Sequence, residues 1–176
     1  MTMAVFDFAA ALPNRLYWDS SFLVNIAFAA AKFHKPCTDY YYLLKAEGVP
    51  VPVSNLTLDE TWYILLKLES ERIYETPTFW DIYRQEPDRL RPFLKKLRDF
   101  TRKVGAAVPY YFCWNEAGSY DQALQTMEKH LLLPRDAYLC AIMQDQEISA
   151  LATTDTDFTP VPGVTIYTCN GKMLSS

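Results

Sequence analysis

Segments typical of β-strands alternate with segments typical of helices along most of this 176-residue chain. The strand-like runs are rich in apolar, β-branched and aromatic residues. They lie at residues 15–19, 49–55, 106–114, 148–155 and 164–169. Strands that are separated by helices usually pair in parallel, with the helices covering the faces of the sheet. The order of the segments therefore predicts the α/β class, as an α/β/α sandwich with a central parallel sheet.

The segments between these strands have apolar residues at three- and four-residue spacing, or are rich in alanine, as helices are. They cover residues 20–33, 38–48, 57–73, 79–85, 89–104, 119–130 and 136–146. Hydrophobic residues make up 50% of the chain, which is enough for one core, so we expect a single domain over residues 1–176. Within it, residues 1–13 are expected to form an extension before the first strand, and residues 75–105 a helical insertion.

Acidic residues stand where the expected strands end and where the following helices begin. Asp19 closes the first strand, and Asp155 closes the strand at 148–155, with Asp157 two residues later. Glu60 and Asp136 lie in the first turns of two helices. Because the carboxyl ends of parallel strands and the starts of the next helices share one edge of a sheet, we expect these carboxylates to meet in one cleft.

Carboxylates that meet without a counter-charge raise one another's pKa, and a divalent cation removes that cost. Hard oxygen ligands of this kind favour Mg²⁺ or Mn²⁺. Mg²⁺ typically uses one or two carboxylates, so four or more indicate either two ions or one ion with a second site completed by substrate. Paired ions can stabilise both the attacking and the leaving oxygen of a phosphodiester.

Each acid also has a purely structural interpretation. Asp19 has the position of a helix N-cap, and Thr57 and Glu60 have the spacing of a capping box. Asp136 could be a carboxylate that only stabilises a helix start, and Asp155 could form an Asx turn. Capping is compatible with metal binding, so both interpretations stay open for each residue.

The segments "LYWDSSFLVN", "SNLTLDETW" and "PRDAYLCAIMQDQEISALATTDTDF", in this order, resemble the PIN-domain family, and most of all its VapC-type toxin nucleases. The resemblance covers residues 14–168. Its most specific part is Asp136, an apolar helix, an apolar strand and then "TTDTDF". It implies a PIN-like fold and an Mg²⁺- or Mn²⁺-dependent endoribonuclease that hydrolyses RNA with a metal-activated water and no covalent nucleophile. The positions that match the family's catalytic metal ligands are Asp19, Glu60, Asp136 and Asp155.

The resemblance also assigns supporting roles and partners. Asp157 matches an auxiliary acid, either behind the metal ligands or at a second ion. Ser20 and Thr154 match hydroxyls that orient the carboxylates or the water. Membership of the toxin branch implies a homodimer and a cognate antitoxin of a type II toxin–antitoxin pair. The long stretch between Glu60 and Asp136, like the extension at residues 1–13, departs from the compact members of the family.

Basic residues are concentrated in one segment of an acidic chain. The net charge is −4, yet residues 84–103 carry eight Lys and Arg against three acids. Four of these bases recur at helical spacing and form one stripe beside the apolar face of the expected helix: Arg91, Lys95, Arg98 and Arg102. Such a stripe suits a phosphate backbone, so we expect it to bind RNA. The alternative is an outer face that is only solvated.

The cysteines and the apolar runs bear on location. The four cysteines are scattered and only two histidines are present, which argues against a zinc site and favours reduced thiols in a cytoplasmic protein. The sequence shows no secretory signal and no apolar run of membrane-spanning length, so no membrane partner is expected.

Two other functions remain: a Mg²⁺-dependent phosphatase or phosphotransfer enzyme, and a catalytically inactive PIN-like interaction module. The pair "DTD" lies at the end of the strand at 148–155 rather than on the first strand, which argues against a phosphotransfer enzyme. None of the expected acids is missing, which argues against an inactive module.

Overall fold

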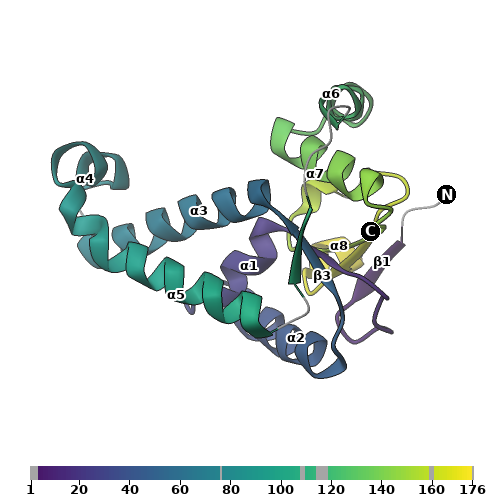
Figure 1. The fold of residues 1–176 in the computed structure, drawn as a ribbon, viewed down its shortest axis with the longest axis horizontal. Coiled ribbons are helices and arrows are strands. Elements are labelled where there is room, and N and C mark those ends of the chain that lie inside the picture. The colour runs from purple at the N-terminus through teal and green to yellow at the C-terminus, as the bar shows by residue number, and fades with distance from the viewer. Residues whose placement is uncertain (1–3, 76, 108–109, 114–118, 159–160, 176) are drawn as a thin grey trace.

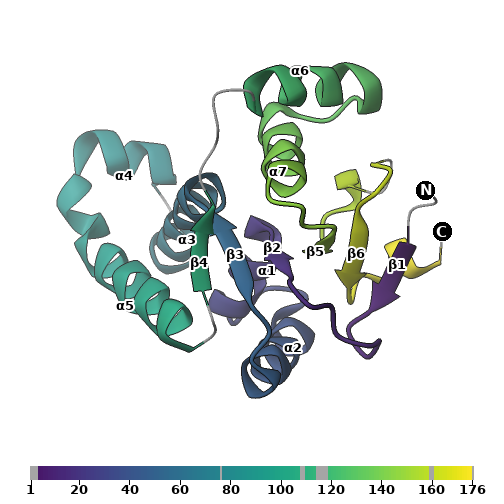
Figure 2. The ribbon, with the colours of Figure 1, turned by 45° about the vertical axis from the view of Figure 1, so that its right-hand side comes forward.

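The strands form one row of parallel neighbours. The computed structural model describes residues 4–75, 77–107, 110–113, 119–158 and 161–175. Within these ranges the strands are β1 (Ala4–Asp7), β2 (Tyr17–Trp18), β3 (Val51–Ser54), β4 (Tyr110–Cys113), β5 (Ala150–Ala152) and β6 (Thr165–Thr168). One parallel sheet has the order β1-β6-β5-β2, and β3 pairs in parallel with β4. The Leu16 N–H donates to the Pro50 carbonyl at 3.1 Å, so β3 lies beside β2 (Figure 2). The predicted α/β fold with a central parallel sheet is confirmed.

The N-terminal segment contributes an edge strand. The sequence places residues 1–13 before the first strand, but Ala4–Asp7 form β1 and pair with Thr165–Thr168 of β6. The run "AVFD" is only four residues long, and its last two residues are exposed. An edge strand of this kind has little hydrophobic alternation, which is why periodicity alone does not distinguish it from a loop.

Each predicted helix is present, two with the predicted bounds and the others with shifted ones. The helices are α1 (Ser20–Ala27), α2 (His34–Glu47), α3 (Asn55–Tyr74), α4 (Phe79–Gln85), α5 (Arg91–Ala107), α6 (Ser119–His130), α7 (Pro134–Asp145) and α8 (Gly171–Leu174). The largest difference concerns α1, which ends six residues before the predicted end at residue 33. Phe28 is extended, and the Asn25 side chain accepts from the Phe33 N–H at 3.0 Å. This bond brings Phe33 next to the last turn of α1, so the alanines at 29–31 lie outside the helix despite their high helix propensity.

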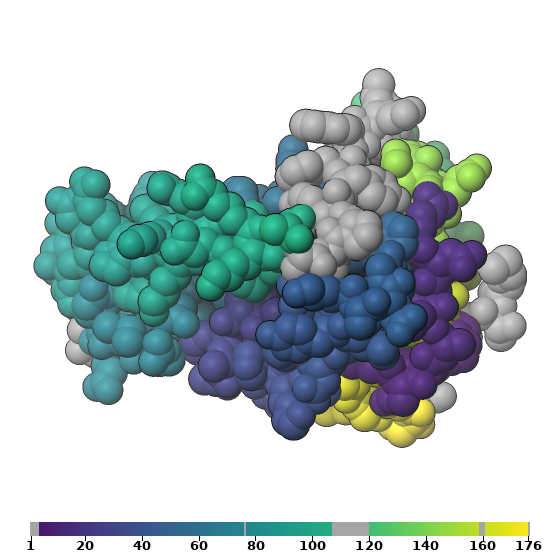
Figure 3. Space-filling view, turned by 60° about the horizontal axis from the view of Figure 1, so that its bottom comes forward, coloured from purple at the N-terminus to yellow at the C-terminus, as the bar shows by residue number. Residues whose placement is uncertain are grey.

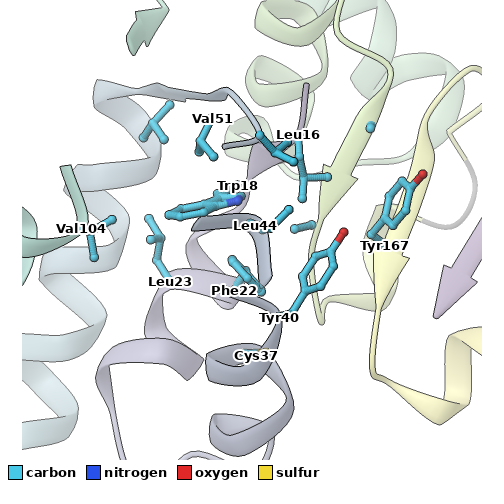
Figure 4. Packing of buried hydrophobic residues seen from close by; sticks show 14 of the residues in the cluster. Leu16, Trp18, Phe22, Leu23, Cys37, Tyr40, Leu44, Val51, Val104 and Tyr167 are labelled. Atoms are coloured by element: carbon cyan, nitrogen blue, oxygen red, sulfur yellow. The ribbon is translucent and has the colours of Figure 1, made fainter. Parts of the chain in front are cut away.

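Two hydrophobic clusters lie on opposite faces of the sheet. Trp18 of β2 packs with Phe22 of α1 and Leu44 of α2 on one face (Figure 4). Its neighbour Tyr17 belongs to the other cluster, with Leu151 of β5 and α7 residues that include Ile142. Successive strand residues point to opposite faces, so "YW" supplies a large aromatic group to each side. This arrangement confirms the sandwich and fixes the strand end where Asp19 follows.

Helices α3, α4 and α5 form an arm that projects from the sheet. Figure 1 shows α3 and α5 side by side along their lengths, with α4 at the far end, and Figure 3 shows the arm extending from the body. A separate cluster of Phe79, Ile82, Leu90 and Phe93 holds the arm together. The predicted helical insertion at 75–105 corresponds to most of this arm. None of the helices in the described ranges has the length and apolar character that a membrane crossing requires.

The end of α2 gives a stability prediction. Gly48 has φ of +64°, in the left-handed region, and the next N–H, from Val49, donates to the Leu44 carbonyl at 3.1 Å. A Cβ at Gly48 would meet no atom within 4 Å, so the cost of Gly48→Ala is conformational. We expect a loss of about 1 kcal/mol in the free energy of unfolding, measured by urea titration. Gly171→Ala is the control, because that position is equally open and lacks positive φ; equal losses would contradict the prediction.

Candidate metal centre

Asp19 lies at the junction of β2 and α1 and is buried. It is the N-cap of α1, and its carboxylate accepts the backbone N–H groups of Ser20 at 2.7 Å and Ser21 at 3.2 Å. Only 3% of the residue is exposed. The structural interpretation of Asp19 as an N-cap is therefore correct, and the cap places its charge at the carboxyl edge of the sheet.

Hydroxyl groups complete the surroundings of Asp19. The Ser21 hydroxyl donates to it at 2.6 Å and the Thr153 hydroxyl at 2.8 Å. Hydrogen bonds to a carboxylate favour its charged form, but burial outweighs them here, and the pKa of Asp19 is raised. The site thus holds a buried carboxylate that neutral donor groups fix in orientation.

Glu60 reaches the same edge from the second turn of α3. The Ser20 hydroxyl donates to it at 3.1 Å, and the Arg135 guanidinium lies 3.4 Å from its other oxygen. The predicted capping-box alternative is wrong, because α3 begins at Asn55 with Ser54 as its N-cap. The Ser54 hydroxyl accepts from the Thr57 N–H at 3.2 Å, which leaves the Glu60 carboxylate available for other contacts.

Asp136 lies within electrostatic range of the other acids. It stands in the first turn of α7, and its pKa is raised to about 7. Burial is the largest cause, and the negative charges of four other carboxylates add to it. These are Asp19, Asp155, Glu60 and Asp157. We call these five residues the acidic edge.

Asp155 and Asp157 lie just after β5. The Thr153 hydroxyl accepts from the Asp155 N–H at 3.0 Å, and the Asp155 carboxylate accepts from the Asp157 N–H at 3.0 Å. The second bond is the Asx turn that the sequence suggested. One oxygen of Asp155 is engaged in this turn, while Asp157 is exposed. A metal role for either residue stays a prediction.

The supporting hydroxyls differ in part from those expected. Ser20 contacts Glu60, as described, but the Thr154 hydroxyl accepts from the Asn25 amide at 3.2 Å. Asp19 is instead contacted by Thr153, one residue earlier. Neighbouring residues of an extended segment point to opposite sides, so only one of the two threonines can face Asp19. That alternation is the sequence signal that could have identified Thr153. The Arg135–Glu60 ion pair joins distant parts of the chain, so no pattern within one segment predicts it.

The donor set of the acidic edge suits a hard divalent cation. The candidate ligands are carboxylate oxygens, and a divalent cation would neutralise the negative charges that, after burial, raise the pKa of Asp136. Within the described residues, no three carboxylate, imidazole or thiol groups lie close enough together to coordinate one ion. The oxygen chemistry of these residues fits Mg²⁺ or Mn²⁺, whereas the carboxylates would have to move closer together for three of them to hold one ion.

Comparisons with known proteins identify the fold. No family model matches the chain, and no curated protein matches it in sequence. VapC20 of Mycobacterium tuberculosis, a sarcin-ricin loop cleaving toxin, matches with a TM-score of 0.54 and 18% identity, over 82% of this chain and 92% of that one. The chain has a PIN-like fold. The PIN-like fold expected from the sequence is thereby confirmed.

Two further structures support this assignment. PAE2754 of Pyrobaculum aerophilum matches with a TM-score of 0.53 and 14% identity, over 92% of this chain and 88% of its own. A chain of VapBC2 of Rickettsia felis, solved with a DNA fragment of its promoter, matches with a TM-score of 0.53 and 12% identity, over 87% and 97%. Identities this low establish a shared PIN-like fold, and the activity has to be argued from the site.

Proposed function

We propose that this PIN-like protein is a metal-dependent endoribonuclease, and that it is the toxin of a type II toxin–antitoxin pair. The observation that carries the proposal is the acidic edge at the carboxyl ends of the strands, where burial and the negative charges of four other carboxylates raise the pKa of Asp136. The likeness in fold to VapC20 and VapBC2 supports a toxin nuclease over other uses of such a cluster.

In this proposal the metal ligands are Asp19, Glu60, Asp136 and Asp155, with Asp157 as an auxiliary acid. A bound Mg²⁺ or Mn²⁺ would supply Lewis-acid stabilisation of the phosphodiester and lower the pKa of a water molecule. The chain's own residues fix the ligands: Thr153 and Ser21 orient Asp19, and Ser20 orients Glu60. Arg135 neutralises part of the charge of Glu60 and, being partly exposed, can also face an incoming phosphate.

The alternative functions are less consistent with the site. A phosphotransfer enzyme needs an accessible carboxylate as nucleophile, but Asp19 is 3% exposed and both of its oxygens accept hydrogen bonds. An inactive interaction module has no need of five acids at one edge, because the repulsion among them costs stability. The partners that follow from the proposal are RNA, a cognate antitoxin and a second copy of the chain, in the cytoplasm.

The test is cleavage of RNA by the purified protein. A long single-stranded RNA is incubated with MgCl₂, with MnCl₂, or with EDTA, and the products are resolved on denaturing gels. Cleavage that needs Mg²⁺ or Mn²⁺ and yields internal products supports the proposal. Cleavage that persists in EDTA refutes the metal-dependent mechanism, and an absence of cleavage with either metal refutes the ribonuclease assignment.

The threonine contacts give a second prediction. Thr153→Val removes the hydroxyl that orients Asp19, so we expect Mn²⁺ binding to weaken about 10-fold, as when a group behind a metal ligand is lost. Thr154→Val is the matched control, because it removes a hydroxyl that contacts Asn25 instead. Titration calorimetry with Mn²⁺ measures both variants. A larger loss in Thr154→Val would show that the sequence-based assignment of Thr154 is the correct one.

A further inference from the structure

An open groove runs between α3 and α5 on the projecting arm. Its volume is about 560 Å³, which is within the range of small-molecule sites. The α3 wall presents Asp59, Trp62, Tyr63 and Leu66, which are spaced as one face of a helix. The α5 wall includes Leu97, Arg98 and Arg102. The groove therefore has an aromatic wall facing a wall that combines leucines with two arginines.

The aromatic wall is exposed and held in place. Trp62 is 41% exposed, and its indole N–H donates to the Thr101 hydroxyl of α5 at 2.9 Å. Tyr63, also exposed, contacts the rings of Phe79 and Trp80 at centroid distances of 5.9 and 6.2 Å. Large aromatic side chains that are both exposed and fixed are suited to stacking against a planar group without further ordering.

The basic stripe of α5 divides into two parts. Arg91 lies outside the groove and pairs with Asp88 at 2.7 Å. Lys95 is exposed and does not line the groove. Arg98 and Arg102 do line it, and neither takes part in the ion pairs that the described residues form. These two guanidinium groups lie one helical turn apart, so they present two positive charges to the same groove.

The groove opens beside the acidic edge. Asp59 lines it, and Glu60 is the next residue of α3. The Arg135 guanidinium lies 3.5 Å from Asp59 and 3.4 Å from Glu60, so one side chain joins the groove to the candidate metal centre. The groove and the candidate metal centre are therefore neighbours, with Arg135 paired to one acid of each.

We infer that this groove binds single-stranded RNA next to the scissile bond, with a base stacked on Trp62 and backbone phosphates on Arg98 and Arg102. The inference rests on the proposed ribonuclease function. Single-stranded nucleic acid satisfies both walls, because every base has a stacking face and every linkage carries a negative charge. An apolar peptide helix would satisfy the aromatic wall only and would leave two guanidinium groups covered without a counter-charge.

The experiment measures RNA binding without cleavage. A fluorescein-labelled single-stranded RNA of mixed sequence is titrated with the full chain in EDTA, and fluorescence anisotropy is recorded at several salt concentrations. The double variant Arg98→Gln/Arg102→Gln is expected to bind at least about 10-fold more weakly, with a shallower salt dependence. Arg91→Gln is the matched control on the same helix, and its affinity should change by less than about twofold because Arg91 is already paired outside the groove.

Trp62 supplies an independent readout. Trp62→Ala is expected to weaken RNA binding about 10-fold, whereas Trp62→Phe retains a stacking ring and should stay close to wild type. Quenching of tryptophan fluorescence by RNA should occur in wild type and be strongly reduced in Trp62→Phe. Equal affinities of wild type, the double arginine variant and Trp62→Ala would overturn the inference and leave the groove to a protein partner.

Failure of the groove and failure of the proposed function give different results. Metal-dependent cleavage with unchanged RNA binding in all groove variants refutes the groove alone. Groove-dependent RNA binding without cleavage in Mg²⁺ or Mn²⁺ refutes the nuclease function and retains the groove as an RNA site.

Discussion

Asp19→Asn is expected to reduce Mn²⁺-dependent RNA cleavage at least about 100-fold, to the level measured in EDTA. The change removes one negative oxygen ligand from the most deeply buried member of the acidic edge. A loss of this size is what removal of one pre-organised electrostatic group typically causes. Initial rates of cleavage at saturating Mn²⁺ give the measurement.

The variant is suited to this test because its fold should be preserved. The asparagine oxygen can still accept one of the two backbone N–H groups that Asp19 caps, and asparagine is in general as good an N-cap as aspartate. Glu128→Gln, an exposed change on α6, is the control for loss of an acidic charge. Cleavage by Asp19→Asn within a few-fold of wild type would exclude Asp19 as a metal ligand.

The general position of Asp19 was predictable from sequence for a physical reason. Strand–helix alternation implies parallel pairing, and parallel pairing places every strand end at one edge. The run "RLYWD" therefore located Asp19 at that edge without knowledge of its contacts. The same rule located Asp155 after β5 and Asp136 at the start of α7, whose charges do interact in the folded chain.

The cap of α3 and the ion pair of Arg135 depend on contacts with other parts of the chain, so no pattern within one segment predicts them. Ser54 rather than Thr57 caps α3, because β3 runs directly into the helix and the Tyr17 hydroxyl accepts the Ser54 N–H at 3.1 Å. The Arg135–Glu60 pair joins α7 to α3 across 75 positions of sequence. Likewise, Arg91, Arg98 and Arg102 belong to one stripe of α5 in the sequence. Only Arg91 pairs with Asp88, and only Arg98 and Arg102 line the groove.

Asp136→Asn is expected to stabilise the metal-free protein at pH 8 by about 2 kcal/mol. In the folded chain the pKa of Asp136 is about 7, above the ordinary value of 3.8. The folded state therefore retains this proton more tightly than the unfolded state does. The stability that this bound proton gives to the folded state is fully present below pH 3.8 and is lost as the pH rises through 7. The full shift corresponds to roughly 4 kcal/mol at about 1.4 kcal/mol per pKa unit, and we halve it because the side chain is partly exposed to solvent.

A divalent cation should reverse this order of stability. Mn²⁺ that binds only the folded protein stabilises it by about 2.7 kcal/mol at 100 times the dissociation constant. At pH 8 this gain should be large for wild type and small for Asp136→Asn, and for wild type it should shrink as the pH falls below 7 and protons compete for the carboxylate. Urea titrations at pH 6 and pH 8, with and without Mn²⁺, measure these differences, with the exposed Asp99→Asn as control. A metal-free Asp136→Asn protein that is less stable than wild type at pH 8 would contradict the repulsion among the five acids. The same stabilisation by Mn²⁺ in both proteins would instead place the cation away from Asp136.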